Sequence, residues 1–286
     1  MTSSTHVTVY LMGTAHISND SSADVKALLD HTRPDVVFLE LCEQRMPLLE
    51  PETKHDFAPN VTFWEKVKTI QEASGMAKGT AIGTVLLTQV QGDYAESLGV
   101  ELGGEFRAAW EHCLRFQPIC ILGDRPLQVT MLRAWESLTW WGKFRCLVAL
   151  LWSLWQKPNP QKLQDWMQSI LEGDSDLLTE SMAELRKAFP TLATVILQER
   201  DAYMACKIYQ TCRRLPRHVN VSMVAIVGAG HCEGICDWLT NGNGQQPEDV
   251  LAEIVKTRKF PSQLVAPLVT DVTHIPCRRD IFSSLQ

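Results

Sequence analysis

Two segments that lie far apart in the chain follow one pattern: an apolar run leads into Gly-x-x-His and then into a segment that favours a helix. The first is 7–16 (VTVYLMGTAH), and the second is 221–231 (VSMVAIVGAGH). Short apolar runs predict buried strands, and glycine allows backbone paths at the following turn that other residues resist. Each unit therefore brings an imidazole to the edge of a sheet, and we expect His16 and His231 to converge on one site.

Two further apolar runs extend this pattern, at 36–41 (VVFLEL) and 119–122 (ICIL). Both are continuous rather than alternating, which is typical of parallel strands that are covered on both faces. A helix predicted over 21–31 joins the strands at 7–12 and 36–41 into a β-α-β unit of ~35 residues. We therefore expect an α/β fold with a pseudo-duplicated strand–Gly-x-x-His–helix core.

The sequence contains no tandem repeat and no segment with the composition of a linker, so we expect a single domain over residues 1–286. Between the sheet-forming segments, apolar spacing favours large helical insertions. The tail from 258 onward has little periodicity and predicts an edge strand or an arm. The sheet-forming ends are 7–42, 119–126 and 220–240, and the insertions are 43–118 and 127–215. The predicted helices include 64–73, 127–155 (as one helix or two), 163–171, 177–189, 191–214, 229–239 and 250–255.

Composition narrows the class of protein. The formal charge of −6, without any run of Lys or Arg, argues against a general nucleic-acid binder. Nine cysteines without a regular framework fit reduced, intracellular thiols, and the first residues lack the features of a secretory signal. The longest apolar stretch, 146–155, has about half of the ~20 residues that a membrane span needs, so we expect it to form a buried helix.

Glu40 lies inside the strand predicted at 36–41, where its neighbours are apolar. A buried carboxylate is costly unless it is paired or bound to a metal. Two interpretations follow. Either Glu40 meets His16 in a shared site, or it forms a buried pair with Arg45 or another arginine.

Glu199 falls on the apolar stripe of a long predicted helix, three residues after Ile196 and four before Tyr203. With Arg200 and Asp201 it forms a charge triplet, and charges in a row usually mark a solvated helix face. The position on the stripe favours a buried network as the alternative.

Asp124 and Arg125 directly follow a predicted strand, in the same topological position as the two histidines. Asp-Arg-Pro can form a simple turn, but an arginine there can also hold a carboxylate of a substrate or of Glu40. Glu105 and Arg107 lie at a helix start after two glycines, where a carboxylate also interacts with the helix dipole.

Six strings in this chain, taken in order, resemble the TraB-domain family, and the chain is most similar to its eukaryotic intracellular branch. The resemblance spans residues 7–240. The strings are 13–18 (GTAHIS), 33–42 (RPDVVFLELC) with Arg45, 103–107 (GGEFR), 123–126 (GDRP), 199–201 (ERD) and 228–231 (GAGH).

The TraB-domain family is grouped with bacterial TraB/PrgY pheromone-shutdown proteins and with the TIKI metalloproteases, which cleave peptides with paired Gly-x-x-His motifs, a glutamate and a divalent metal. Carried over, the resemblance implies a metal site at His16, Glu40 and His231 that takes Mn, Co or Zn. It also implies a mixed central sheet flanked by helices on both faces. Several intracellular relatives lie on the mitochondrial outer membrane, so we expect the cytoplasm or the cytosolic face of that membrane.

The expected function is a metal-dependent, peptidase-like hydrolase in which a metal-bound water attacks a peptide or protein substrate. Glu40 or Glu199 would shuttle protons. Arg125 or Arg200 would stabilise the oxyanion or bind a substrate carboxylate. The candidate catalytic residues are Glu40, Glu105, Arg125, Glu199 and Arg200, and the candidate substrate-binding residues are Arg45, Arg107 and Asp124.

Two alternatives remain open at this point. The first is a non-catalytic adaptor at the mitochondrial outer membrane or at organelle contact sites, suggested by six of the nine tryptophans falling between 135 and 166. The second is a metal-free hydrolase with histidine as general base, similar to the erythromycin esterases. The enzyme hypotheses require His16, Glu40 and His231 to meet at one point.

Overall fold

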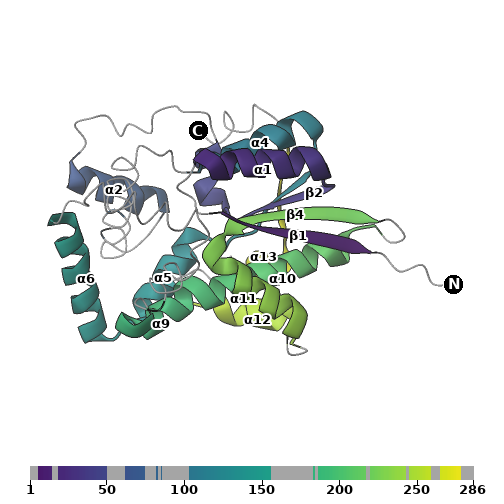
Figure 1. Ribbon diagram of the computed structural model, residues 1–286. Helices are drawn as coiled ribbons and strands as arrows, with labels where there is room; N and C mark the ends of the chain where they lie inside the picture. The colour runs from purple at the N-terminus through teal and green to yellow at the C-terminus, as the bar shows by residue number, and fades with distance from the viewer. Residues whose placement is uncertain are drawn as a thin grey trace.

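A computed structural model of the chain describes residues 6–14, 19–49, 62–74, 82, 85, 103–155, 183, 186–216, 220–242, 245–258 and 265–277. These residues form a mixed α/β fold around a five-stranded sheet (Figure 1). Of the predicted helices, 163–171 lies outside the described residues, and so does most of 177–189 and of the insertion at 43–118.

The sheet order is β1-β4-β2-β3-β5. The first four strands are parallel, and β5 pairs antiparallel with β3. The predicted edge strand in the C-terminal tail is therefore confirmed. The strands are β1 (Val7–Thr14), β2 (Val36–Leu39), β3 (Ile119–Leu122), β4 (Val221–Gly228) and β5 (Thr273–Ile275).

The two strands that carry the Gly-x-x-His segments are neighbours. Gly13 pairs with Val227 and Thr14 with Gly228, so both segments leave the sheet at the same edge. Strand β4 separates β1 from β2 and pairs with both. His16 itself lies outside the described residues.

Helices cover both faces of the sheet, as expected (Figure 1). On one face, α1 (Asn19–Thr32) and α4 (Gly104–Phe116) pack over Val37 and Leu39. On the other face, α10 (Glu199–Arg214) and α11 (Ala229–Asn241) pack over Val36 and Phe38. Because neighbouring residues of β2 enter opposite cores, both must be apolar, and this explains the continuous apolar run.

The remaining elements lie around this frame. Residues 127–155, where the sequence predicts one or two helices, form two. The helix predicted over 191–214 begins at Pro190 and contains a π-helical turn. The elements are η1 (Glu43–Leu49, 3-10), α2 (Phe63–Ser74), α5 (Leu127–Ser137), α6 (Trp140–Trp155), α9 (Pro190–Ala193), η2 (Thr194–Gln198, π), α12 (Pro247–Ile254) and α13 (Val265–Thr270).

Two glycines are required by close packing at the ends of strands. A Cβ atom on Gly123 would lie 1.7 Å from Cζ of Phe38, and one on Gly13 would lie 2.8 Å from Sγ of Cys232. The glycine of the first Gly-x-x-His segment therefore lets α11 pack directly on the end of β1.

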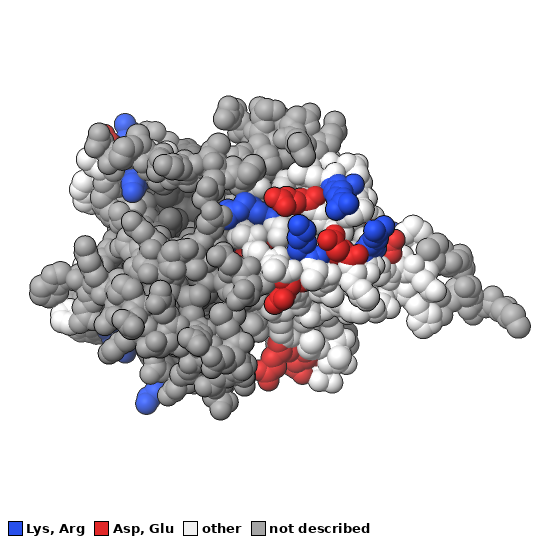
Figure 2. All heavy atoms as spheres, turned by 45° about the horizontal axis from the view of Figure 1, so that its top comes forward, with Lys and Arg blue, Asp and Glu red and all other residues white. Residues whose placement is uncertain are grey.

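The surface over α1 and α4 carries mixed charge. Lys and Arg side chains alternate there with Asp and Glu (Figure 2). On the described part of this face, no extended area of one sign is visible.

The prediction that 146–155 forms a buried helix is wrong. Helix α6 lies at one end of the molecule, away from the sheet (Figure 1), and Leu151 and Trp152 are 51% and 55% exposed. At its start, Trp140 and Trp141 are 79% and 71% exposed. Within the described ranges, no helix is both long and apolar enough to cross a membrane.

Lys207 is buried on α10 and ties the C-terminal segment to the fold. Its Nζ donates to the carbonyl oxygens of Leu268 (2.7 Å) and Asp271 (2.5 Å) and to Oε1 of Gln210 (3.3 Å). Burial, aided by the charge of Arg214, lowers the pKa of Lys207 from 10.5 to about 8. The ammonium form therefore costs free energy in the folded state.

This burial makes stability depend on pH. Between pH 8 and 10.5 the unfolded chain holds a proton on Lys207 that the folded chain has released, so stability rises with pH across this window. We expect wild type to gain on the order of 2–3 kcal/mol relative to Lys207→Met between pH 7 and 10. Urea unfolding at both pH values measures this, with the exposed Lys26→Met as control. A difference that does not change with pH would contradict it.

Candidate functional site

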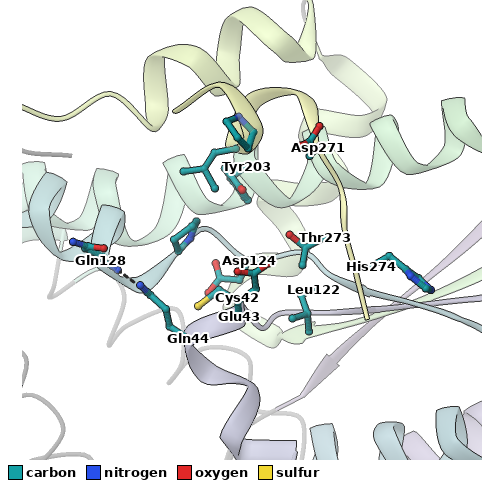
Figure 3. A pocket seen from close by; sticks show the side chains of 13 residues that line it. Cys42, Glu43, Gln44, Leu122, Asp124, Gln128, Tyr203, Asp271, Thr273 and His274 are labelled. Carbon is teal, nitrogen blue, oxygen red and sulfur yellow. Dashed lines mark hydrogen bonds between the residues drawn. The ribbon is translucent and has the colours of Figure 1, made fainter. Parts of the chain in front are cut away.

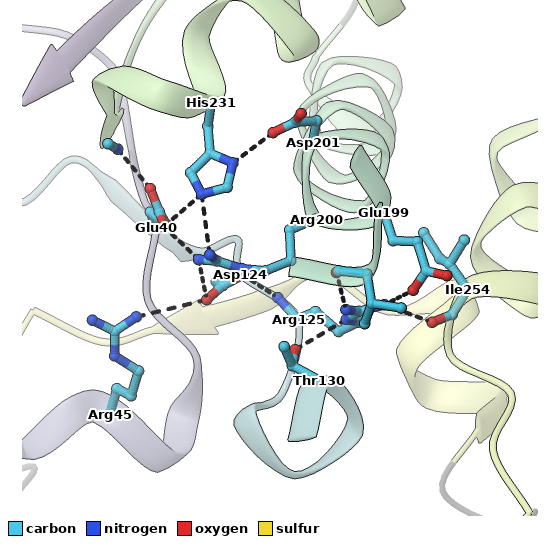
Figure 4. Close-up of polar contacts among 12 residues, drawn as sticks. Glu40, Arg45, Asp124, Arg125, Thr130, Glu199, Arg200, Asp201, His231 and Ile254 are labelled. Carbon is cyan, nitrogen blue, oxygen red and sulfur yellow. Dashed lines mark hydrogen bonds and ion pairs between the residues drawn. The ribbon is translucent and has the colours of Figure 1, made fainter. Parts of the chain in front are cut away.

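A network of charged side chains gathers around Arg200, in the first turn of α10 (Figure 4). Its Nε and Nη2 donate to Oδ1 and Oδ2 of Asp124, each at 2.9 Å, and Nη2 also donates to Oε1 of Glu40. Its Nη1 lies 3.0 Å from Nε2 of His231. One guanidinium thus joins residues that follow β2, β3 and β4.

Backbone pairing places the two carboxylates. The amide of Glu40 donates to the carbonyl of Ile226, and the amide of Asp124 donates to the carbonyl of Leu41. Glu40 Oε2 also accepts the amide of Gly228 at 2.6 Å. The interpretation that Glu40 pairs with an arginine is confirmed: its partner is Arg200.

His231 is oriented by a second carboxylate. Its Nδ1 lies 2.5 Å from Oδ1 of Asp201, and its Nε2 lies 3.4 Å from Oε1 of Glu40. A guanidinium can only donate, so Nε2 accepts from Arg200 and the ring proton is assigned to Nδ1, which donates to Asp201. Burial raises the pKa of Asp201, and the hydrogen bond from His231 partly offsets this.

Asp201 was not predicted from the sequence to be a site residue. The sequence feature that could have indicated it is Gly234, which lies one turn after His231 on α11. A Cβ atom on Gly234 would lie 2.2 Å from Oδ2 of Asp201, so glycine makes room for the carboxylate.

A second network holds Glu199. The fully buried Arg125 donates from Nη1 to Oε2 of Glu199 (2.6 Å) and from Nε to Oγ1 of Thr130 (3.0 Å). Arg133 donates to both oxygens of Glu199, at 2.6 and 2.5 Å. The predicted buried network around Glu199 is confirmed. Arg125 pairs with Glu199 rather than with Glu40.

The π turn before Glu199 has a specific consequence. The amide of Glu199 bonds to the carbonyl of Thr194, five residues earlier, so the carbonyl of Val195 loses its usual helical partner. Nη2 of Arg125 donates to this carbonyl at 2.8 Å. Arg125 therefore stabilises the turn that sets the direction of Arg200 and Asp201.

The two networks together balance their charges. Burial alone would lower the pKa of Arg200, but the charges of Asp124 and Glu40 outweigh it and raise that pKa. Burial lowers the pKa of Arg125 despite its partner Glu199. Four carboxylates face four guanidiniums: Glu40, Asp124, Glu199 and Asp201, and Arg45, Arg125, Arg133 and Arg200.

The other candidate residues lie around the network. Arg45, in η1, has Nη1 3.8 Å from Oδ2 of Asp124 and a side chain that is 33% exposed. Glu105 is buried in the first turn of α4, and Arg107 is partly exposed beside it. Neither Glu105 nor Arg107 is among the partners of Arg200.

The ligand types expected for a metal are partly present. An imidazole whose second nitrogen donates to a carboxylate, as in His231–Asp201, is the usual arrangement of a metal-binding histidine. However, Arg200 engages both Nε2 of His231 and Oε1 of Glu40. Among the described residues no group of three His, Cys, Asp or Glu could hold a metal ion. As arranged, these two residues do not fit a divalent metal unless Arg200 moves.

Sequence comparison identifies the family. The sequence model of the TraB/PrgY/gumN family matches residues 1–241. The chain belongs to this family. The Arg200 network is defined as Arg200 with Glu40, Asp124, Asp201 and His231, and all five residues lie within the matched part.

Relatives occur in mammals and beyond. The TraB domain-containing proteins of Bos taurus and Homo sapiens are each 36% identical over 253 residues, covering 83% of this chain and 64% of theirs. An uncharacterized protein of Methanocaldococcus jannaschii is 28% identical over 269 residues, covering 90% of this chain and 59% of its own. This member of the TraB family thus spans less than two thirds of the length of these relatives.

The network predicts how the fold responds to the loss of Arg200. In Arg200→Met, Glu40 and Asp124 stay buried without their main cation, and we expect a loss of about 3–5 kcal/mol in the free energy of unfolding. Adding Glu40→Gln should recover part of this loss. Urea denaturation measures both. Arg213→Met, on the same helix but exposed, should cost about 1 kcal/mol or less. Equal losses for Arg200 and Arg213 would contradict the central role of Arg200.

Proposed function

We propose that this TraB-family protein is a hydrolase, peptidase-like as the family resemblance implies, with its centre at the Arg200 network. The observation that carries the proposal is the orientation of His231 by Asp201, with Nε2 facing Glu40 and Arg200 (Figure 4). An imidazole held by a carboxylate is the common proton-transfer group of hydrolases. It lies at the carboxyl edge of parallel strands, where α/β proteins bind ligands.

The chemistry follows from the donors and acceptors. In the structure, Nη1 of Arg200 points at Nε2 of His231. A substrate carbonyl that accepts this N–H would free the Nε2 lone pair to take a proton from an attacking water. The same guanidinium would then stabilise the oxyanion that forms on the carbonyl. Asp201 stabilises the imidazolium, and Glu40 holds Arg200 in place. As the oxyanion collapses and the C–N bond breaks, the imidazolium would give its proton to the leaving amine.

The metal implied by the resemblance stands as a variant of this proposal. His16, Glu40 and His231 would hold Mn, Co or Zn, which would activate the water. In the arrangement described, Arg200 already supplies the positive charge next to Glu40 and His231. No step of the proposed reaction therefore depends on the metal.

The reaction is tested with a library of short fluorogenic peptides. We expect His231→Asn and Asp201→Asn each to lower kcat/KM by about 10²–10⁴, because both remove oriented proton transfer. Glu233→Gln, an exposed change on the same helix α11, should leave kcat/KM unaltered. Absence of hydrolysis by wild type, or full activity in His231→Asn, contradicts the proposal.

The same assay distinguishes the metal variant. We expect turnover to survive treatment with a chelator. Loss of activity on chelation, with recovery on adding Mn²⁺, Co²⁺ or Zn²⁺, would favour the metal site at His16, Glu40 and His231 and a displaced Arg200.

A second candidate function is an adaptor on the mitochondrial outer membrane or another organelle surface. Helix α6 exposes a row of large apolar side chains, and its only charged residues are the cations Lys143 and Arg145. Apolar helices with basic residues and tryptophans are typical of binding at the surface of anionic bilayers. The exposed set is Trp140, Trp141, Phe144, Leu147, Val148, Leu151 and Trp152.

Vesicle co-sedimentation tests this second candidate. We expect wild type to bind vesicles that contain phosphatidylserine, and Trp141→Glu with Trp152→Glu to reduce the bound fraction at least tenfold. Tyr209→Glu, at a residue that is 45% exposed on α10, is the matched control and should not change binding. Equal loss in the control variant, or no binding by wild type, would contradict the adaptor.

A further inference from the structure

Three buried thiols meet where the C-terminal segment, residues 265–277, joins the core. Cys113 lies in the last turn of α4, Cys120 lies in β3, and Cys277 follows β5. All three belong to the apolar core that α1 and α4 form on one face of the sheet. The Cys113 thiol is hydrogen-bonded to both of the others. One cluster of cysteines thus connects α4, β3 and the C-terminal segment.

Backbone geometry independently brings these cysteines together. Cys120 pairs with Ile275 in the ladder between β3 and β5, so Cys277 lies two residues further along, on the same face of the sheet as Ile275. Gln117 joins the other pair. Its amide donates to the carbonyl of Cys113 at 2.9 Å, and its Nε2 donates to the carbonyl of Cys277 at 3.1 Å. Cys113 and Cys277 are therefore neighbours, although they lie far apart in the chain.

The C-terminal segment is held largely through its backbone. Each residue of α13 is at least partly exposed, and β5 contains three residues. The carbonyls at the end of α13, which have no partner within a helix, accept hydrogen bonds from side chains of α10. Gln210 donates to Val269 at 2.9 Å, Arg214 donates to Thr270, and Lys207 donates to Leu268 and Asp271. A segment with few buried side chains opens at a lower free energy than the core around it.

The C-terminal segment also forms one wall of a cavity of about 450 Å³ beside the Arg200 network (Figure 3). Asp124 belongs both to the lining of this cavity and to the network. The lining residues from the C-terminal segment are Pro267, Leu268, Asp271, Thr273 and His274. A bond that fixes the C-terminal segment on the core therefore also fixes this wall of the cavity.

The surroundings of the thiols make them unreactive while the segment is docked. The hydrogen bond to Cys120, together with burial, raises the pKa of Cys113 against an opposing effect of Cys277. The hydrogen bond to Cys113, together with burial, raises the pKa of Cys277. Cys277 is 8% exposed, whereas Cys113 and Cys120 are fully buried. Since the thiolate is the nucleophile in thiol–disulfide exchange, oxidation begins at Cys277 when the segment opens and water reaches it.

We propose that Cys113 and Cys277 form a reversible disulfide that locks the C-terminal segment onto the core. In the open form, the Cys277 thiolate attacks a low-molecular-weight disulfide, such as oxidised glutathione, and displaces one of its thiolates. As the segment returns, the Cys113 thiolate attacks the Cys277 sulfur of the mixed disulfide and displaces the second. The two protein thiols lose two electrons, their protons pass to the two released thiolates, and the small disulfide is reduced to two thiols.

Mass spectrometry tests the disulfide directly. The folded protein is incubated with oxidised glutathione, its remaining thiols are blocked with iodoacetamide, and it is digested without reduction. We expect two peptides linked through Cys113 and Cys277, and we expect dithiothreitol to separate them. Any other pairing of these cysteines, including a link between Cys113 and Cys120, or survival of both thiols after prolonged incubation, overturns the proposal.

Hydrogen–deuterium exchange tests the lock. Oxidation should slow the exchange of amides in α13 and β5 about tenfold or more, because the disulfide prevents local opening of this segment. Cys277→Ser should abolish both the link and the slower exchange, and so should Cys113→Ser. The matched control is Cys236→Ser, at an exposed thiol on α11, which should retain both.

Two features keep this test decisive. Cys277→Ser, at the segment that opens, serves alone if the fully buried Cys113 does not tolerate substitution. Equal exchange in the oxidised and reduced proteins, or slower exchange that persists in Cys277→Ser, would refute the lock. Both measurements are independent of hydrolysis, so the inference is tested apart from the proposed function.

Discussion

The guanidinium of Arg200 is the interaction on which the rest of this site depends. It contacts residues that follow three parallel strands, and it is itself 13% exposed. In a region of low dielectric, each of these charges would be costly alone. The ends of β2, β3 and β4 are therefore held at one place by a single cation on α10, and any ligand that takes over its hydrogen bonds must compensate for all of them.

The second network supports the first through the backbone. Arg125 lies next to Asp124 in sequence, and its amide donates to Oδ1 of Asp124 at 2.8 Å. Its side chain reaches in the opposite direction, to Glu199 and to the π turn. Residues 124–125 and 199–200 thus form two pairs of neighbours that cross-link the end of β3 to the start of α10. This explains why largely buried charged residues occur in both strings.

Much of this arrangement was predictable from the sequence. The continuous apolar runs located the strands, and the apolar neighbours of Glu40 predicted that this carboxylate is buried and paired. Local pattern could not select Arg200 over Arg45 as its partner, because that choice depends on the orientation of α10. Asp201 was missed for the same reason: the residue is adjacent to Arg200 in sequence, but only the packing of α11 brings it to His231.

The exposure of α6 was not predictable from its composition. An apolar stretch too short for a membrane span normally indicates a core helix, and burial would require the sheet or its helices to lie against it. The sheet already has α1 and α4 on one face and α10 and α11 on the other (Figure 1). The described core thus leaves no face of the sheet for a further helix.

The π turn at Thr194–Gln198 implies a constraint on how this helix can vary in length. Each residue of an α-helix turns the chain by about 100°, so a π turn amounts to one additional residue accommodated within the ladder. Removing a residue there would restore regular geometry and rotate everything upstream relative to Arg200 by that angle. Arg125 would then face a carbonyl already paired within the helix. Homologous chains that keep the Glu-Arg-Asp string should therefore also keep the spacing between it and the preceding proline.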